Sequence, residues 1–235
     1  MSKNAFYEQV GVAMTCRSYE EYEKMFDLNL EQFKGEKVLD VAAGASSFTT
    51  SAYHKGYDAY AVDPLYNLSV EEMRKHGEEE IQEASRKLKK GARTLLWDSY
   101  KTLEEHDKIR RDSFSLFMEQ YTQNEKEQRF FHGALPHLPF SDHTFSLLLC
   151  NHFLFLYEEQ FNFQFHVKAM KEMIRVTKKG GEIRIYPLVG FNHEIYPYLN
   201  NLIETLENDH VKIKLLPTTF RFMPKATEML VIYKK

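Results

Sequence analysis

One stretch decides the fold: Val38–Thr49, which reads VLDVAAGASSFT. An apolar strand-like run is followed by a turn of small residues and then by the start of a helix. Small residues let the backbone approach a ligand closely, and the first turn of a helix offers N–H groups without partners. A second apolar run, Tyr60–Val62, ends at Asp63, where a carboxylate can accept hydrogen bonds from ribose hydroxyls. These features predict a nucleotide site in an open α/β sheet.

Size and composition narrow the class of protein. The 235 residues suffice for one domain with a full core, and the net charge of −3 argues against a nucleic-acid partner. Two cysteines, Cys16 and Cys150, suggest no disulfide framework; with no secretion signal, they favour the cytoplasm. The longest apolar-rich stretch, Leu147–Tyr157, is interrupted by Asn151 and His152 and is too short to cross a membrane. We expect a monomer or a homodimer.

Strand-like and helix-like segments alternate along most of the chain. The predicted strands are Lys37–Val41, Tyr57–Val62, Arg129–His132, Phe145–Cys150, Glu182–Tyr186, Lys212–Leu216 and Met229–Tyr233. The predicted helices between them are Ser46–His54, Glu158–Lys178 and Glu194–Leu206. The last two strands can form an antiparallel pair. Since no internal repeat or linker interrupts this order, we interpret residues 1–235 as a single domain.

Two segments fall outside this alternation. Residues 1–35 contain a helix that Ser18 can cap, and we interpret them as a helical lid; the alternative is a helix packed over the sheet. Residues 66–128 are too long for a simple crossover. They contain predicted helices from Ser69 to Gly91 and near Asp112–Gln123, which we interpret as a cover over the substrate site or as an addition to the core.

Two basic runs lie in this second segment, Lys87–Lys90 and Lys108–Arg111. Acidic residues flank both runs. We therefore expect a solvated face here, in preference to a patch that binds RNA.

Four stretches in register resemble one family. They are the strand and turn Val38–Ser46, the strand end Tyr60–Asp63, the run Leu138–Phe145 with its Leu-Pro-Phe start, and Glu172–Glu182 with its double glycine. Together they resemble the class I S-adenosylmethionine-dependent methyltransferases over roughly residues 35–235. The resemblance implies an α/β three-layer sandwich. Its Rossmann-like sheet would have seven mostly parallel strands, with the last strand antiparallel and the helical segment as cover.

The resemblance also implies a cofactor, S-adenosyl-L-methionine, and its binding residues. Asp40 would orient the turn and the cofactor's amino group, Gly44 would admit the methionine part, Asp63 would bind the ribose and Leu65 would pack on the adenine. The lid interpretation, which does not depend on the resemblance, adds Arg17 or Tyr22 as a contact to the ligand. The full predicted cofactor set is Arg17, Tyr22, Asp40, Ala42, Ala43, Gly44, Ser46, Asp63, Pro64, Leu65, Gly133, Ala134, Leu135 and Asn151.

The chain departs from the family pattern in the turn and near the Leu-Pro-Phe run. The family often has three alternating glycines where this chain has Ala42, Gly44 and Ser46, and alanine and serine keep such a turn if their φ stays negative. An acid that often binds the adenine amino group is replaced by Ala134. We therefore expect adenine recognition to use backbone groups of Ala134 and Leu135, or His132. No Asn-Pro-Pro-Tyr or Asp-Pro-Pro-Tyr signature follows the fourth strand, which argues against an adenine-N6 methyltransferase of nucleic acids.

His152 is the best candidate for a catalytic base. Methyl transfer from a sulfonium needs alignment and exclusion of water, and an oxygen or ammonium acceptor must also lose a proton. His152 follows the fourth predicted strand at the edge where ligands collect, and its ordinary pKa suits the task. The alternative is a histidine that only shapes the pocket. The histidines and cysteines lack ligand spacing, so we expect no metal site.

The leading hypothesis is a methyltransferase that acts on a small-molecule acceptor. An RNA or protein methyltransferase would need a basic exposed face near the cofactor. A non-catalytic cofactor-binding regulator would have a closed cavity with no room for an acceptor. A nicotinamide-dependent oxidoreductase fits poorly, because Ala42, Gly44 and Ser47 do not match its three-glycine fingerprint.

Overall fold

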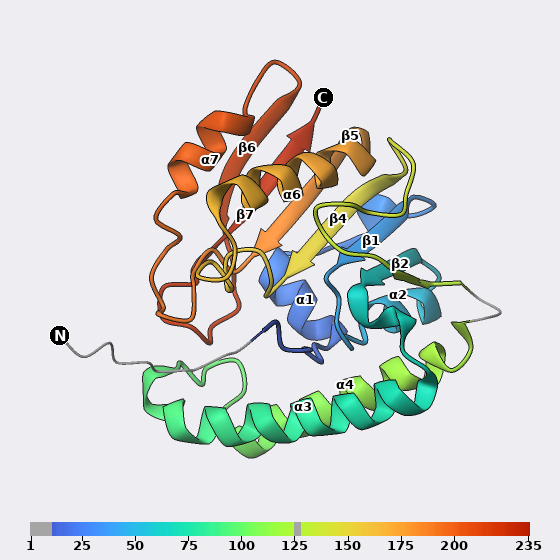
Figure 1. The fold of residues 1–235 in the computed structure, drawn as a ribbon, viewed down its shortest axis with the longest axis vertical. Helices are drawn as coiled ribbons and strands as arrows, with labels where there is room; N and C mark the ends of the chain where they lie inside the picture. The colour runs from blue at the N-terminus through green and yellow to red at the C-terminus, as the bar shows by residue number, and fades with distance from the viewer. Residues whose placement is uncertain (1–10, 125–127) are drawn as a thin grey trace.

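The computed structural model describes residues 11–124 and 128–235 and contains a seven-stranded sheet in the order β3-β2-β1-β4-β5-β7-β6 (Figure 1). The strands are β1 (Lys37–Val41), β2 (Asp58–Asp63), β3 (Phe130–His132), β4 (Phe145–Asn151), β5 (Thr177–Tyr186), β6 (Val211–Pro217) and β7 (Glu228–Lys234). Strand β7 runs antiparallel to both β5 and β6, and the other pairs are parallel. The predicted Rossmann-like sheet with an antiparallel last strand is confirmed.

Helices cover both faces of the sheet and give three layers. Helices α1 (Tyr19–Phe26) and α2 (Phe48–His54) pack on one face, and α6 (Phe163–Val176) and α7 (Leu199–Leu206) pack on the other. Successive side chains of a strand point to opposite faces. The residues of β4 accordingly divide, with Leu147 and Leu149 in the core under α1 and α2 and Leu148 and Cys150 in the core under α6.

Two long helices lie across the carboxyl ends of the strands. Helix α3 (Val70–Gly91) and helix α4 (Leu103–Tyr121) form an antiparallel pair at the bottom of Figure 1. Three short 3₁₀ turns connect the elements: η1 (Leu30–Phe33), η2 (Pro64–Asn67) and η3 (Ala92–Thr94). Of the predicted lid and cover segments, residues 1–10 and 125–127 lie outside the described residues.

Several predicted boundaries are wrong, each for a local reason. Helix α4 starts at Leu103 and not near Asp112, because Thr102 caps it and accepts a hydrogen bond from the N–H of Glu105. Helix α6 starts at Phe163, where Asn162 caps it, and α7 starts at Leu199 and not at Glu194. Strand β5 already starts at Thr177, within the range predicted as the helix Glu158–Lys178, and the double glycine lies inside the strand.

Gly77 of α3 packs against Phe114 of α4. A Cβ atom at this position would lie 2.2 Å from Cζ of Phe114 on α4. Alanine normally favours a helix by about 1 kcal/mol over glycine. We expect the clash to outweigh this gain, so that Gly77→Ala lowers the free energy of unfolding by about 1–3 kcal/mol.

Thermal and urea unfolding of Gly77→Ala measure this effect. Lys75→Ala, at an exposed position of the same helix, is the matched control and should stay near the wild type. A Gly77→Ala variant at least as stable as the wild type would show that the helix pair is not packed as described.

Candidate functional site

The turn after β1 has an unusual backbone. Both Ala42 (φ 54°) and Gly44 (φ 57°) lie in the left-handed region. The condition of a negative φ is therefore not met at Ala42, and an alanine is held there at a cost of roughly 1–2 kcal/mol. Gly44 is required for a second reason, because a Cβ atom there would lie 2.8 Å from the carbonyl oxygen of Thr15.

The segment before α1 crosses this turn. The carbonyl oxygen of Thr15 accepts a hydrogen bond from the N–H of Ala45 at 2.9 Å. The carbonyl oxygen of Arg17 accepts from the N–H of Ser47 at 3.0 Å and from the hydroxyl of Ser46 at 2.9 Å. Backbone groups of this segment thus fix the turn and satisfy N–H groups at the start of α2.

Asp63 ends β2 and faces the same turn. Its carboxylate is 6% exposed and accepts hydrogen bonds from the N–H of Gly44 at 3.0 Å and of Leu65 at 2.9 Å. Burial raises the pKa of Asp63, although these two backbone hydrogen bonds lower it. Each carboxylate oxygen keeps a lone pair for a further donor.

A cavity of about 280 Å³ opens beside Asp63, and we call it the first cavity. Its walls come from the segment before α1, the ends of β1 and β2, the loop after β3 and the loop after β4. The lining residues are Val12, Ala13, Met14, Thr15, Val41, Ala42, Gly44, Val62, Asp63, Pro64, Leu65, Gly133, Ala134, Leu135, Leu138, His152, Phe153, Phe161 and Phe165. Most of these side chains are apolar, and Asp63 is the carboxylate among them.

Asp40 lies behind the turn and is fully buried. The hydroxyl of Tyr22 donates to its Oδ2 at 2.8 Å, and burial raises the pKa of Asp40 well above its usual range. Its Oδ1 has no hydrogen-bond partner among the described residues, and the same is true of Nδ2 of Asn151. A buried acceptor and a buried donor therefore remain unsatisfied next to the turn.

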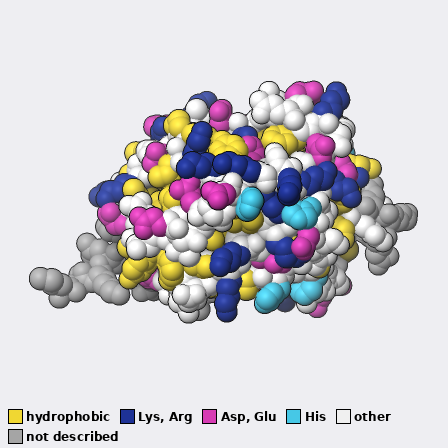
Figure 2. Space-filling model, turned by 90° about the horizontal axis from the view of Figure 1, so that it is seen from above, with side chains coloured by type: hydrophobic (Ala, Val, Ile, Leu, Met, Phe, Trp, Pro, Cys, Tyr) yellow, Lys and Arg dark blue, Asp and Glu magenta, His cyan; other side chains and the backbone are white. Residues whose placement is uncertain are grey.

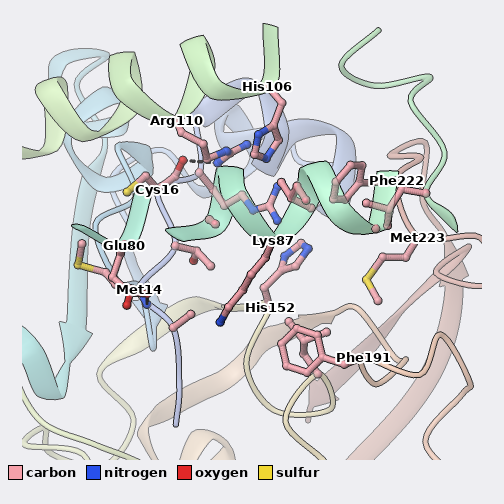
Figure 3. A pocket seen from close by; sticks show the side chains of 18 of the residues that line it. Met14, Cys16, Glu80, Lys87, His106, Arg110, His152, Phe191, Phe222 and Met223 are labelled. Atoms are coloured by element: carbon pink, nitrogen blue, oxygen red, sulfur yellow. Dashed lines mark hydrogen bonds between the residues drawn. The ribbon is translucent and has the colours of Figure 1, made fainter. Parts of the chain in front are cut away.

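A second cavity of about 130 Å³ lies under α3 and α4 (Figure 3). Lys87 reaches into it from α3, His106 and Arg110 come from α4, and His152 points toward it from the loop after β4. Apolar side chains supply most of the remaining wall, among them Leu88, Leu156, Phe191, Phe222 and Met223. Ala13, Met14, Thr15 and His152 line both cavities, so the two spaces meet at these residues.

Charged side chains are buried at one end of the second cavity. Glu21 accepts hydrogen bonds from Arg17, at 3.0 Å, and from Arg110. The hydroxyl of Tyr100 contacts the two guanidinium groups and the carboxylate. Burial alone would raise the pKa of Glu21, but Arg110, Arg17 and the N–H of Ser18 outweigh it and hold that pKa well below its usual range. Two guanidinium groups thus share one carboxylate.

His152 is 5% exposed and sits at the junction of the cavities with φ at 50°. Its N–H donates to the carbonyl oxygen of Tyr186 at 2.7 Å, and its Nδ1 contacts Oδ1 of Asn151. Burial, followed by the positive charges of Arg17 and Arg110, lowers the pKa of His152 well below its usual range. The imidazole is therefore neutral at physiological pH, but the lowered pKa makes it a weaker base than the ordinary pKa assumed from the sequence.

The predicted site residues fall into three groups. Eight of the predicted cofactor residues line the first cavity: Ala42, Gly44, Asp63, Pro64, Leu65, Gly133, Ala134 and Leu135. Buried positions outside both cavity linings hold Tyr22, Asp40, Ala43, Ser46 and Asn151. Arg17 lines the second cavity and not the first, while His152 lines both.

Arg110 and Lys87 are site residues that the sequence analysis placed elsewhere. The solvated face expected at Lys108–Arg111 is wrong for Arg110, which is 5% exposed and paired with Glu21. A signal was present: Arg110 precedes Phe114, Phe117 and Tyr121 at helical spacing, so it lies on the apolar face of α4. Lys87 and Leu88, within the other basic run, line the second cavity.

Comparisons with known proteins agree with this architecture. A family model described as "Methyltransferase domain" matches residues 111–185, from α4 to β5. Uncharacterized protein MJ0045 of Methanocaldococcus jannaschii is 31% identical over 217 residues, which cover 92% of this chain and 93% of that protein.

The chain also matches solved structures at low identity. A TehB-like SAM-dependent methyltransferase from Corynebacterium glutamicum is 12% identical, with a TM-score of 0.46 and coverage of 86% of this chain and 82% of that one. A SAM-dependent methyltransferase from Aquifex aeolicus is 15% identical, with a TM-score of 0.45 and coverage of 91% and 92%.

The chain belongs to the class I S-adenosylmethionine-dependent methyltransferases. It is an enzyme of that class and uses S-adenosylmethionine. The residues present fit this cofactor, because the buried carboxylate of Asp63 stands in a cavity whose other walls are mostly apolar, as an adenosine needs. Within the described ranges, no helix has the length and apolarity to cross a bilayer.

Proposed function

We propose that this methyltransferase acts on a small-molecule acceptor held in the second cavity. The observation that carries the proposal is the junction of the two cavities at Ala13–Thr15 and His152. A ligand in the first cavity and an acceptor in the second would meet at this junction, under the cover of α3 and α4. Such an arrangement supports the in-line approach that methyl transfer needs.

In this proposal the first cavity binds the cofactor. When bound, S-adenosylmethionine supplies an electrophilic methyl group on its sulfonium. Asp63 would accept hydrogen bonds from the ribose hydroxyls, while Leu65, Leu135 and Leu138 would pack on the adenine. Asp40, which lies behind the turn and outside the cavity lining, would orient the turn that faces the cofactor's ammonium group. The remaining predicted residues have positioning roles, since Tyr22 holds Asp40 and the Arg17 carbonyl holds Ser46 and Ser47.

The size and lining of the second cavity favour a small organic acceptor over RNA or protein. Basic residues that could have formed an RNA-binding face, Lys87 and Arg110, contribute to the cavity wall. At the end of the molecule away from α3 and α4, Lys and Arg side chains are interspersed with Asp and Glu (Figure 2). The presence of a second cavity also disfavours a cofactor-binding regulator without an acceptor. A cytoplasmic location and a monomeric or homodimeric state stay predictions from the sequence.

A labelling experiment tests the acceptor class. The protein is incubated with S-adenosylmethionine labelled on the methyl group and with a cell extract separated into small-molecule, RNA and protein fractions. We expect label in a small-molecule product. Label confined to acid-precipitable RNA or protein would contradict the proposal.

We propose His152 as the base, where the acceptor must lose a proton. His152→Ala should lower the rate of methyl transfer about 100-fold or more. The affinity for S-adenosylhomocysteine should change much less. Because the pKa of His152 lies well below its usual range, the rate should show no inflection near pH 6.5.

The matched control is His210→Ala, since His210 is exposed and lines neither cavity. It should retain most of the rate. Equal rates for His152→Ala and the wild type, with a fold confirmed by circular dichroism, would remove His152 from catalysis.

A further inference from the structure

We propose that the acceptor is amphipathic, with an apolar body and one anionic group, a carboxylate or a phosphate, bound by Arg17 and Arg110. This inference rests on the proposed function, because it describes what the second cavity binds. It follows from the charge, the unsatisfied hydrogen-bond donors and the apolar lining at one end of that cavity.

The buried charges around Arg17 and Arg110 do not balance. Arg17 is 7% exposed, Arg110 is 5% exposed, and both share the single carboxylate of Glu21, which is 5% exposed. Burial, followed by the charges of Arg110 and Arg17, lowers the pKa of His106 to about 3, so this neighbour is neutral at physiological pH. Two cations and one anion therefore leave one uncompensated positive charge, and a buried charge without a partner is costly.

The same two arginines also have hydrogen-bond donors without partners in the described ranges. Nε of Arg17 and Nε of Arg110 are buried, and neither donates to any group in the described ranges. Both hydrogen bonds that Arg17 donates there come from its Nη1, to Glu21 and to Tyr100. Arg17 and Arg110 are both among the residues that line the second cavity. Guanidinium groups bind the oxygens of carboxylates and phosphates through paired, charge-assisted hydrogen bonds.

The other charged groups near the cavity lie away from this pair or are already engaged. Oε2 of Glu80 accepts from the N–H of Met14 at 3.1 Å. Lys87 lies 3.6 Å from Glu83, and Asp107 contacts His106 and Ser85. Among the described residues that line the cavity, Glu80 is the carboxylate, so the anionic group of an acceptor would be held at the arginines and away from Glu80.

The remaining wall defines the rest of the acceptor. Leu88, Leu95, Leu156, Phe222 and Met223 line the cavity with Ile81 and give it an apolar surface. A space of about 130 Å³ fits a short apolar body. An anion held at the arginines would leave that body free to extend toward His152, where the cavities meet.

Calorimetry with matched probes tests this inference. Benzoate, phenyl phosphate and the neutral benzamide are titrated into the protein saturated with S-adenosylhomocysteine. We expect at least one of the two anions to bind at least about tenfold more tightly than benzamide. Arg110→Gln, which leaves Arg17 and Glu21 as a neutral pair, should remove this preference, whereas Arg110→Lys should keep part of it.

The control is Arg111→Gln, which changes an exposed arginine next in the chain and should leave anion binding unchanged. Tighter binding of phenyl phosphate than of benzoate would identify a phosphate monoester, and the reverse order a carboxylic acid. Equal binding of the anions and benzamide, an unchanged preference in Arg110→Gln, or no binding of either anion at millimolar concentration would overturn the inference. Failure of S-adenosylhomocysteine itself to bind would instead overturn the proposed function.

Discussion

Asp63→Ala should weaken the binding of S-adenosylmethionine at least about 100-fold. The proposed ribose contacts are two hydrogen bonds to a charged group, each worth about 1.5–3 kcal/mol. Asp63 also accepts from the N–H groups of Gly44 and Leu65, so its removal frees the turn that forms the cavity wall. Isothermal titration of the wild type and the variant gives the ratio of dissociation constants.

Two further variants separate binding from folding. Asp63→Asn keeps one carbonyl oxygen and should lose less affinity than Asp63→Ala. Asp58→Ala removes a carboxylate at the opposite end of β2, where Asp58 pairs with Arg129 at 2.6 Å, and should leave cofactor affinity near that of the wild type. Loss of affinity below tenfold in a folded Asp63→Ala protein would assign the ribose to other residues.

Glu21→Ala should lower the free energy of unfolding by about 3–5 kcal/mol at neutral pH. The variant leaves Arg17 and Arg110 buried without their shared carboxylate. It also removes the Glu21 side chain from the N–H of Ser18 at the start of α1. Urea unfolding measures the loss, and Glu20→Ala, at an exposed position of the same helical turn, is the control.

The pH dependence of the same variant has a defined sign. Because the pKa of Glu21 is lower in the folded protein than in the unfolded chain, its contribution is present above about pH 4 and is lost as the pH falls toward the folded-state pKa. Glu21→Ala should therefore lose less stability than the wild type on acidification below about pH 4. The double variant Glu21→Ala with Arg110→Gln should regain part of the stability. Purely additive effects would contradict the shared ion pair.

The succession of strands along the chain was predictable from the sequence, whereas several of their boundaries, and those of the helices, were not. Buried parallel strands such as β4 read as continuous apolar runs, and β1 ends at the turn of small residues as expected. The start of α4 was missed because Leu103–Arg111 is largely charged and its cap at Thr102 gives a weak signal. In the sequence, Gly180 is compatible both with the end of a helix and with a position inside a strand. In the structure it lies within β5 with a positive φ.

The site was predictable where it depends on backbone motifs and not where it depends on packing. The turn at Gly44 and the carboxylate of Asp63 come directly from local sequence, and both line the first cavity. The second cavity is formed by α3, α4 and several non-helical segments that are far apart in the chain. Arg110 was read as a surface charge because its partner, Glu21, is on another helix, and only the tertiary structure brings the two together.

The assignment of the first cavity to S-adenosylmethionine is tested most directly by calorimetric titration of the purified protein with this cofactor, with NAD as the control ligand. We expect one site per chain with micromolar affinity for S-adenosylmethionine and no binding of NAD. Absence of S-adenosylmethionine binding by protein confirmed to be folded, or binding of NAD in its place, would contradict the assignment of the first cavity.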